Sequence, residues 1–359
     1  MEEWKEYKLG DVCSRLRSGK GIKADSVFNS GKYPVIGGNG VRGYADVPNF
    51  EGQAAVIGRQ GAYCGNVRFF EGEAYMTEHA VVAVGNELAD TRFLACLLSL
   101  MHLGNLSAQS AQPGISVQTL SKQPIRLPSI SYQKKVSAII KSLDDKIEVN
   151  RRINDNLEQQ AQALFKSWFV DFKPFRNGEF VESELGMIPK GWRVGKLSEL
   201  IEVKYGKDHK KLVDGIIPVY GSGGLMRYAE KSLFTGESVL IPRKGTLNNV
   251  MYVNEAFWTV DTMFYSIPRI ADIMLFVFLF LKNIDLLSLN AGSAVPSMTT
   301  EILNNMKMII PDKLTINRFN SIVYKLYLII KHNKIESRRL AELRDTLLPK
   351  LMSGELKVN

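Results

Sequence analysis

The residues best suited to chemistry in this sequence are cations and amides set in glycine-rich segments. Arg59-Gln60-Gly61 is such a segment in the first half of the chain, and Arg243-Lys244-Gly245 is its counterpart in the second half. Guanidinium groups pair with guanine N7 and O6, amides pair with adenine, and lysines pair with phosphates. These residue types therefore favour recognition of nucleic acid over catalysis.

Further residues of the same types surround these two segments. For any one of them, ordinary solvated charge is the alternative explanation, but it is weaker for loops that recur in both halves. The candidates in the first half are Arg15, Arg17, Lys20, Lys23, Asn39, Arg42, Arg59, Gln60, Tyr63, Asn66 and Arg68. The candidates in the second half are Lys204, Lys207, Lys210, Lys211, Ser222, Arg227, Arg243, Lys244, Asn248 and Asn249.

Motifs for catalysis and cofactor binding are sparse. Residues 38–43 fit G-x-G-x-x-G, but no amphipathic helix follows, so a glycine-rich turn explains them better than a dinucleotide site. The sequence has no G-x-x-x-x-G-K-[ST] segment and no adjacent prolines, which argues against an ATP motor and an amino-methyltransferase. Scattered histidines and cysteines without C-x-x-C spacing indicate neither a metal site nor a disulfide framework. We expect a chain that binds no cofactor or metal and catalyses nothing alone.

The charge composition of the chain indicates which kind of partner it binds. The 359 residues include 46 Lys plus Arg and 37 Asp plus Glu, which gives a formal net charge of +9 and favours a polyanionic partner. The length predicts about two domains. The longest apolar run, 273–281, is too short to span a bilayer, and residues 1–5 lack the pattern of a signal peptide. We therefore predict a cytoplasmic protein with reduced cysteines and no membrane partner.

The second half of the sequence repeats the first at a shift of 182 to 188 residues. The matched segments are 33–38 with 217–222, 57–61 with 241–245, and 73–77 with 255–259. Coincidence would not keep these segments in order, so we interpret the chain as a duplication. The copies differ within their loops, where Gln60 stands against Lys244 and Tyr63 against Leu247. The repeat thus predicts two similar scaffolds that read different short sequences.

The scaffold of each copy is predicted to be mostly β. Over about 130 residues, short β-branched or aromatic runs alternate with Gly, Asn and Pro, as short strands and hairpins require. One helix interrupts each copy, at 91–103 and at 272–282. The apolar density of these two helices indicates core packing.

A heptad pattern follows each β segment. In the first copy its positions are Val136, Ile140, Leu143, Ile147, Asn150, Asn154, Leu157, Ala161, Leu164 and Trp168. In the second copy they are Phe319, Val323, Leu326, Ile330, Asn333, Ser337, Leu340, Arg344, Leu347 and Leu351. Spacing of 4 and 3 residues over several heptads is typical of a coiled-coil seam. The first helix, over about 133–169, would be roughly 55 Å long.

Connectivity predicts that the two long helices pair antiparallel about a pseudo-twofold axis. An axis near residues 152 and 335 would set Asn154 against Asn333 and Asn150 against Ser337. A buried polar layer of this kind costs stability but penalises slipped registers. The predicted fold is α+β, with β domains at 1–131 and 186–314 and helical regions at 132–185 and 315–359.

Together these features resemble the specificity (S) subunit of type I restriction-modification systems. Three segments carry the resemblance most specifically, namely residues 165–172, 186–192 and 347–355. The Gly-Arg-x-Gly loop at Gly58 adds to it, although Pro242 replaces the first glycine in the second copy. The resemblance covers essentially the whole chain.

The resemblance implies that each β domain is a target recognition domain for one half of a bipartite, asymmetric double-stranded DNA site. It implies that the helices set the spacer length and dock two methyltransferase (M) subunits. S-adenosylmethionine would then bind in the M subunits, and ATP and Mg in restriction (R) subunits, with no cofactor held by this chain. The resemblance also agrees with the antiparallel helices expected from connectivity.

Two other classes of protein remain open at this stage. A free-standing nuclease or methyltransferase would cleave DNA or transfer methyl groups without partners, and we expect neither activity from the purified chain. A coiled-coil scaffold that binds protein or glycan would leave the mobility of duplex DNA unchanged when an M subunit is added. These two observations separate the three classes.

Overall fold

The computed structural model describes residues 3–107, 113–290 and 296–358. The chain forms two compact units, of which unit 1 comprises residues 1–149 and 335–359 and unit 2 comprises residues 150–334. Each long helix therefore contributes one half to each unit. The predicted domain boundaries remain predictions, and the one at 185/186 falls in the turn between two short antiparallel strands, Phe180–Ser183 and Gly186–Pro189.

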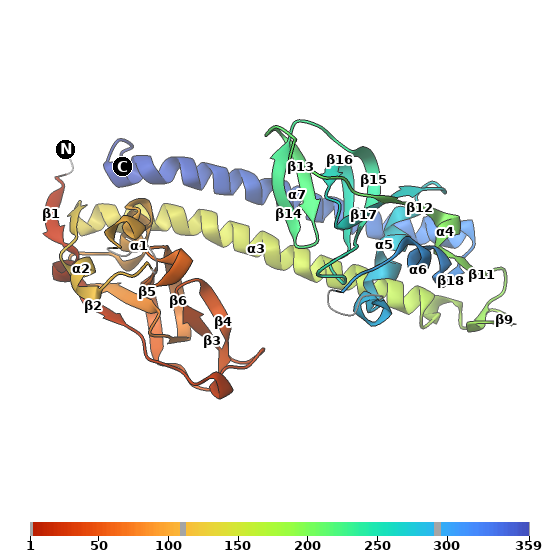
Figure 1. Ribbon diagram of the computed structural model, residues 1–359, viewed down its shortest axis with the longest axis horizontal. Helices are drawn as coiled ribbons and strands as arrows, with labels where there is room; N and C mark the ends of the chain where they lie inside the picture. The colour runs from red at the N-terminus through yellow and green to blue at the C-terminus, as the bar shows by residue number, and fades with distance from the viewer. Residues whose placement is uncertain (1–2, 108–112, 291–295, 359) are drawn as a thin grey trace. The chain divides into compact units, whose positions relative to one another are not determined.

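Unit 1 contains the first eight strands of the chain, two short helices, and one half of each long helix (Figure 1). Its strands are β1 (Lys5–Lys8), β2 (Cys13–Ser18), β3 (Tyr33–Gly37), β4 (Gly40–Ala45), β5 (Phe50–Gly58), β6 (Val67–Met76), β7 (Ala80–Gly85) and β8 (Pro124–Leu127). Its helices are α1 (Thr91–Leu100), α2 (Val117–Ser121) and the first half of α3 (Ile130–Phe169). The second half of α7 (Lys313–Ser353) completes the unit.

Unit 2 repeats this order after the second half of α3. Its strands are β9 (Phe180–Ser183), β10 (Gly186–Pro189), β11 (Arg193–Lys196), β12 (Ile201–Tyr205), β13 (Ile217–Gly221), β14 (Gly224–Ala229), β15 (Phe234–Pro242), β16 (Met251–Thr259), β17 (Met263–Pro268) and β18 (Lys307–Ile310). Its helices are α4 (Leu197–Leu200), α5 (Met274–Lys282), α6 (Thr300–Asn305) and the first half of α7. The β9–β10 hairpin has no counterpart in unit 1 among the described strands.

Both units contain the same six-stranded sheet. Its strand order is β2-β7-β5-β6-β3-β4 in unit 1 and β12-β17-β15-β16-β13-β14 in unit 2. All pairings in these sheets are antiparallel except β3 with β6 and β13 with β16, which are parallel. A smaller pair, β1 with β8 or β11 with β18, accompanies each sheet. The shared topology confirms the α+β fold of two mostly-β domains, each followed by a long helix.

Each sheet is buried on both faces because its central strands are apolar at successive positions. In β5, Ala55 and Ile57 join the cluster formed with α1 and α3, whereas Ala54 and Val56 join a cluster on the opposite face. Continuous apolar runs of this kind are typical of strands covered on both sides. Unit 2 follows the same rule, with Val239 and Ile241 facing α5 and Leu240 facing the other side.

The long helices run antiparallel within each unit. In unit 1, Asp144 of α3 pairs with Arg344 of α7 at 2.9 Å, and Lys146 pairs with Glu336 at 3.2 Å. In unit 2, Phe169 lies 4.8 Å from Phe319 between ring centroids, and Asn154 meets Asn333. All twenty heptad positions named above are buried or half-buried. Each long helix thus buries the stripe that its heptad pattern predicts.

One of the two predicted polar pairs is present. Asn333 donates a hydrogen bond from Nδ2 to Oδ1 of Asn154 at 2.9 Å, and both side chains are buried in unit 2. Asn150 is also buried in unit 2, and Ser337 is half-buried in unit 1. The pairing of Asn150 with Ser337 remains a prediction.

Helices α1 and α5 are shorter than predicted because a residue with positive φ lies at one end of each predicted helix. Helix α1 ends at Leu100 instead of 103, because His102 adopts a left-handed conformation with φ of 48°. Helix α5 begins at Met274 instead of 272, because Asp272 has φ of 60°. A right-handed helix cannot include such a residue.

Candidate nucleic-acid interface

Loops from four parts of the chain meet at one end of the sheet in unit 1. The backbone N–H of Lys20 donates to the carbonyl oxygen of Met76 at 2.9 Å, and that of Arg59 donates to His79 at 2.9 Å. The β3–β4 turn joins them, since a Cβ on Gly38 would lie 3.1 Å from the carbonyl oxygen of His79. The turn can approach this closely because glycine has no side chain. Backbone contacts thus hold several candidate residues at one edge.

Side-chain contacts orient some of the candidates at this edge. Arg68 donates to the carbonyl oxygen of Asn39 at 2.9 Å and to its Oδ1 at 3.3 Å. Gln60 meets His79 through a 3.1 Å contact between Oε1 and Nδ1. Arg59 lies 3.5 Å from Ser18 Oγ and is half-buried. These contacts pre-position cations and amides, as selective base contacts require.

The remaining candidates of unit 1 differ in exposure. Arg15 is half-buried, with its guanidinium 5.1 Å from the centre of the Phe50 ring. The pKa of Arg15 is lowered mainly because the side chain is buried, and also because Arg17 carries a like charge nearby. The exposed candidates are Arg17, Lys20, Lys23, Arg42, Tyr63 and Asn66. Tyr63 has half of its side chain in solvent. We therefore regard Arg15 as mainly a packing residue.

Unit 2 builds the corresponding edge with the same backbone contacts. The N–H of Lys207 donates to Thr259 at 2.9 Å, and that of Arg243 donates to Thr262 at 2.8 Å. Asn249 donates from Nδ2 to the carbonyl oxygen of Ser222 at 2.8 Å and so ties the β13–β14 turn to the β15–β16 loop. Gly245 has φ of 83°, close to the 78° of Gly61, so the turn keeps its geometry although Pro242 replaces glycine.

Several candidates of unit 2 already have partners within the fold. Arg227 donates from Nη2 to Asp214 and to the carbonyl oxygen of Leu212, both at 2.8 Å. Asn248 contacts Asp285 at 2.8 Å and the N–H of Leu287 at 3.2 Å. These contacts give Arg227 and Asn248 clear structural roles. Lys204 forms a 2.5 Å ion pair with Glu202.

Among the other unit 2 candidates, Arg243 contacts an aromatic side chain that the sequence patterns did not single out. Arg243 stacks on Tyr205 with its guanidinium carbon 5.2 Å from the ring centre, and Tyr205 is 51% exposed. Trp258 donates from Nε1 to the carbonyl oxygen of Lys207 at 2.9 Å. The exposed lysines of this edge are Lys207, Lys210, Lys211 and Lys244. An exposed ring beside a cation suits stacking, and exposed lysines suit phosphate contacts.

The two hairpin turns also expose apolar residues that were not predicted as candidates. Leu225 and Met226 of β14 are 48% and 55% exposed, and Val41 of β4 is 59% exposed. The strand registers make Val41 equivalent to Leu225, and Arg42 equivalent to Met226. Only the duplication could have signalled these positions, by comparing the two hairpins residue by residue.

No catalytic constellation accompanies these edges in the residues that the structure describes. Among them, no group of three or more His, Cys, Asp or Glu side chains is arranged to hold a metal ion. Burial raises the pKa of Cys13 to about 12 and of Cys96 to about 11, so neither thiol is an activated nucleophile. No helix of the described segments is long and apolar enough to cross a membrane.

Comparison with known proteins identifies the class to which this fold belongs. The sequence matches the family described as type I restriction modification DNA specificity domain over residues 1–159 and 189–344. The chain therefore belongs to this family, and the resemblance noted from its sequence is confirmed. The two matched ranges correspond to the two copies of the repeat.

Individual relatives carry names from the same family. The type I restriction enzyme MjaIX specificity subunit of Methanocaldococcus jannaschii is 30% identical over 290 residues, which cover 72% of this chain and 66% of that protein. The HindI specificity subunit of Haemophilus influenzae is 24% identical over 461 residues, covering 99% of this chain and 100% of that protein. The similarity is thus to specificity subunits of type I restriction enzymes.

A solved structure shares the fold. The crystal structure of a type I restriction-modification system S subunit from M. genitalium superposes with a TM-score of 0.64 at 17% sequence identity. The match covers 98% of this chain and 96% of that one.

Proposed function

We propose that this chain is the DNA sequence-specificity subunit of a type I restriction-modification complex. In this proposal, each β domain reads one half of a bipartite, asymmetric double-stranded DNA target. The observation that supports it most is the pair of equivalent loop edges carrying different side chains, with Gln60 bridged to Gly114 in one and Lys244 bridged to Ser297 in the other. A shared scaffold with different contact residues is what two different half-sites require.

The long helices have two roles in this proposal. They set the length of the nonspecific spacer between the half-sites, and they dock two methyltransferase subunits. S-adenosylmethionine would bind in those subunits, and ATP and Mg would bind in restriction subunits, with no cofactor held by this chain. The complex would act in the cytoplasm. The buried Asn154–Asn333 pair supports the spacer role, because it penalises slipped registers of the helices that set the distance.

The test of this proposal is an insertion of one heptad into both α3 and α7, near residues 152 and 335. The complex with its methyltransferase subunit is used to methylate a random DNA library, and the methylated sites are sequenced. We expect a changed spacer between two unchanged half-sites. Changed half-sites with a constant spacer would contradict the role of the helices.

A further inference from the structure

The β3–β4 and β13–β14 hairpins carry the same β-bulge at the same place. In β4 the pairing register shifts by one residue, so that Arg42 has no partner on β3. In β14 the register shifts in the same way, so that Met226 has no partner on β13. Bulges of this kind redirect a side chain and are common beside functional sites. Each unit therefore presents one long side chain at an equivalent point of its hairpin.

A glycine on the facing strand makes room for this side chain in each unit. A Cβ on Gly37 would lie 2.7 Å from Cδ of Arg42, and a Cβ on Gly221 would overlap Sδ of Met226. A larger residue at either glycine would have to displace the long side chain that lies across it. Both long side chains are nevertheless exposed, and Met226 is 55% exposed. The two hairpins thus share the support for this position as well as the bulge.

The residue beneath this position differs between the units in the same sense as the long side chain. Thr77 and Val260 are equivalent, because each donates its backbone N–H to β3 or β13, at 2.9 Å and 3.0 Å. Oγ1 of Thr77 and Cγ2 of Val260 each lie 3.7 Å from the Cβ that the facing glycine lacks. The Thr77 hydroxyl has no hydrogen-bond partner among the described residues. A polar group thus lies beside Arg42, and a methyl group lies beside Met226.

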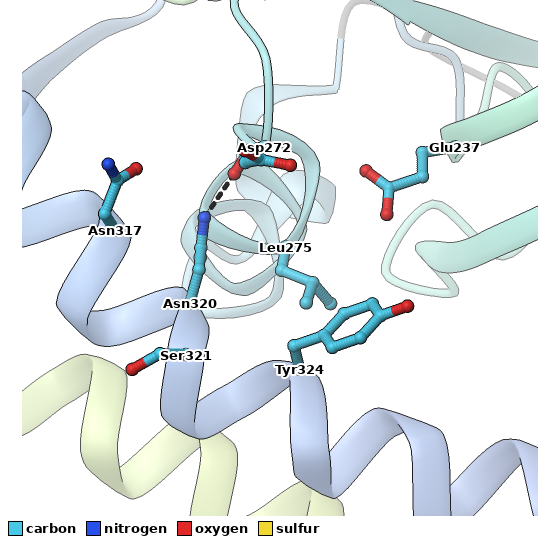
Figure 2. Close-up of a pocket in the computed structure, with 7 residues that line it drawn as sticks. All are labelled: Glu237, Asp272, Leu275, Asn317, Asn320, Ser321 and Tyr324. Carbon is cyan, nitrogen blue, oxygen red and sulfur yellow. Dashed lines mark hydrogen bonds between the residues drawn. The ribbon is translucent and has the colours of Figure 1, made fainter.

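The charges of unit 2 favour its loop edge over its cleft as a surface for DNA. Asn249 ties the β13–β14 turn to the loop that carries the exposed Lys244. The cleft between β15, α5 and α7 instead presents the carboxylates of Glu237 and Asp272, with no lysine or arginine among its described lining residues (Figure 2). Phosphates would meet cations at the edge and carboxylates at the cleft. Met226 therefore lies on the surface to which DNA is attracted.

We propose that Met226 is a specificity-determining residue that contacts the C5-methyl group of a thymine in the major groove, an inference that rests on the proposed function. Apolar side chains distinguish thymine by this methyl group, whereas arginine distinguishes guanine by N7 and O6. Among the described residues, none forms a hydrogen bond or ion pair with the Arg42 guanidinium, so it is available for a guanine. The same bulge thus reads a thymine in one half-site and a guanine in the other.

The test compares thymine with uracil, because the two bases differ only by the C5-methyl group. The complex of the full-length chain with its methyltransferase subunit is titrated with duplexes in which each thymine of the methylated motif is replaced in turn. We expect one replacement to weaken wild-type binding about fourfold, as the loss of one buried methyl group predicts. Met226→Ala should abolish the effect of that replacement and leave the effects of the others unchanged.

The matched control is Ile270→Ala. Ile270 is also an exposed apolar residue of unit 2, at 40%, but it follows β17 at the end of the sheet opposite to the loop edge. We expect this variant to discriminate between thymine and uracil as the wild type does.

A second variant gives unit 2 the side chain of unit 1. Gly221 leaves room for a long side chain as Gly37 does, so Met226→Arg should keep the melting temperature of the wild type. Sequencing of its methylated sites should show guanine instead of thymine at one position, with the other half-site and the spacer unchanged. An unchanged motif in Met226→Arg would contradict the proposal.

The remaining outcomes separate this proposal from the proposed function. Equal binding of the wild-type complex to every thymine and uracil duplex would overturn the role of Met226 while leaving the proposed function intact. A uniform loss of affinity on all duplexes in Met226→Ala would identify a contact that is independent of sequence, and would overturn it as well. Failure of the wild-type complex to methylate a defined motif would overturn both.

Discussion

The loop edges of the two sheets differ in side chains while sharing their backbone. Both edges join the end of one outer strand (β2 or β12), a glycine-rich hairpin turn and the loop that follows β5 or β15, and equivalent backbone hydrogen bonds hold the loops together. In unit 1 the edge carries Arg42, Gln60 and the Asn39–Arg68 pair, whereas in unit 2 it carries lysines, exposed Met226 and the Arg243–Tyr205 stack. The comparison teaches that the fold fixes where contacts are made and the loop side chains fix which contacts they are.

The largest expected effect of a single substitution concerns an aromatic cluster between the two long helices in unit 2. Phe319 is fully buried against Phe165, Trp168 and Phe169, and its counterpart in the repeat is Val136. Phe319→Ala should lower the free energy of unfolding by about 3–5 kcal/mol. Val136→Ala should lower it by about 2 kcal/mol, because only two methyl groups are lost. Urea titration followed by circular dichroism measures both, and equal losses would contradict the assigned difference in packing.

A prediction on DNA sharpens the comparison of the two edges. Arg59→Ala and Arg243→Ala should each weaken recognition of one half-site only, by ~1–3 kcal/mol if the arginine contacts guanine through two hydrogen bonds. Binding of the complex to duplexes altered in one half-site at a time measures the effect. Equal losses on every sequence would instead identify phosphate contacts.

The polar contacts between the long helices provide a smaller difference. Asn154→Leu would leave the buried Nδ2 of Asn333 without its acceptor and should cost about 1–3 kcal/mol of stability. Arg344→Leu in unit 1 removes an ion pair with Asp144 whose side chains are about one third exposed, and should cost at most about 1 kcal/mol. The double variant of Asn154 and Asn333 to Leu should recover most of the first loss. If Arg344→Leu lowered the free energy of unfolding more than Asn154→Leu did, the buried amide pair would not be the stronger of the two contacts.

The sequence pattern predicted the parts of the fold that depend on periodicity and repetition. The heptad positions marked the buried stripes of α3 and α7 and the Asn154–Asn333 pair, and the duplication predicted two equivalent β domains. Features that depend on tertiary contacts were not predictable. The left-handed Asp272 shortens α5, and the β9–β10 hairpin crosses the predicted boundary between the helical region that ends at 185 and the β domain that begins at 186.

In the candidate site, too, some residues could be predicted from the sequence and others depend on tertiary contacts. The basic and amide residues near Arg59 and Arg243 were found from their types and their recurrence in both halves. The internal partners of Arg227 were not, because Asp214 reaches it only across the folded hairpin. Tyr205 was also missed, since nothing in the pattern distinguishes an exposed aromatic residue at the end of a strand from a buried one.

The central claim is that the two β domains read different halves of one DNA target. It is tested most directly by replacing residues 186–314 with the matching segment of the H. influenzae relative and sequencing the methylated sites of cells that carry the hybrid with the methyltransferase subunit. We predict that one half of the methylated motif changes while the other half and the spacer stay the same. A motif changed in both halves, or in neither, would contradict the claim.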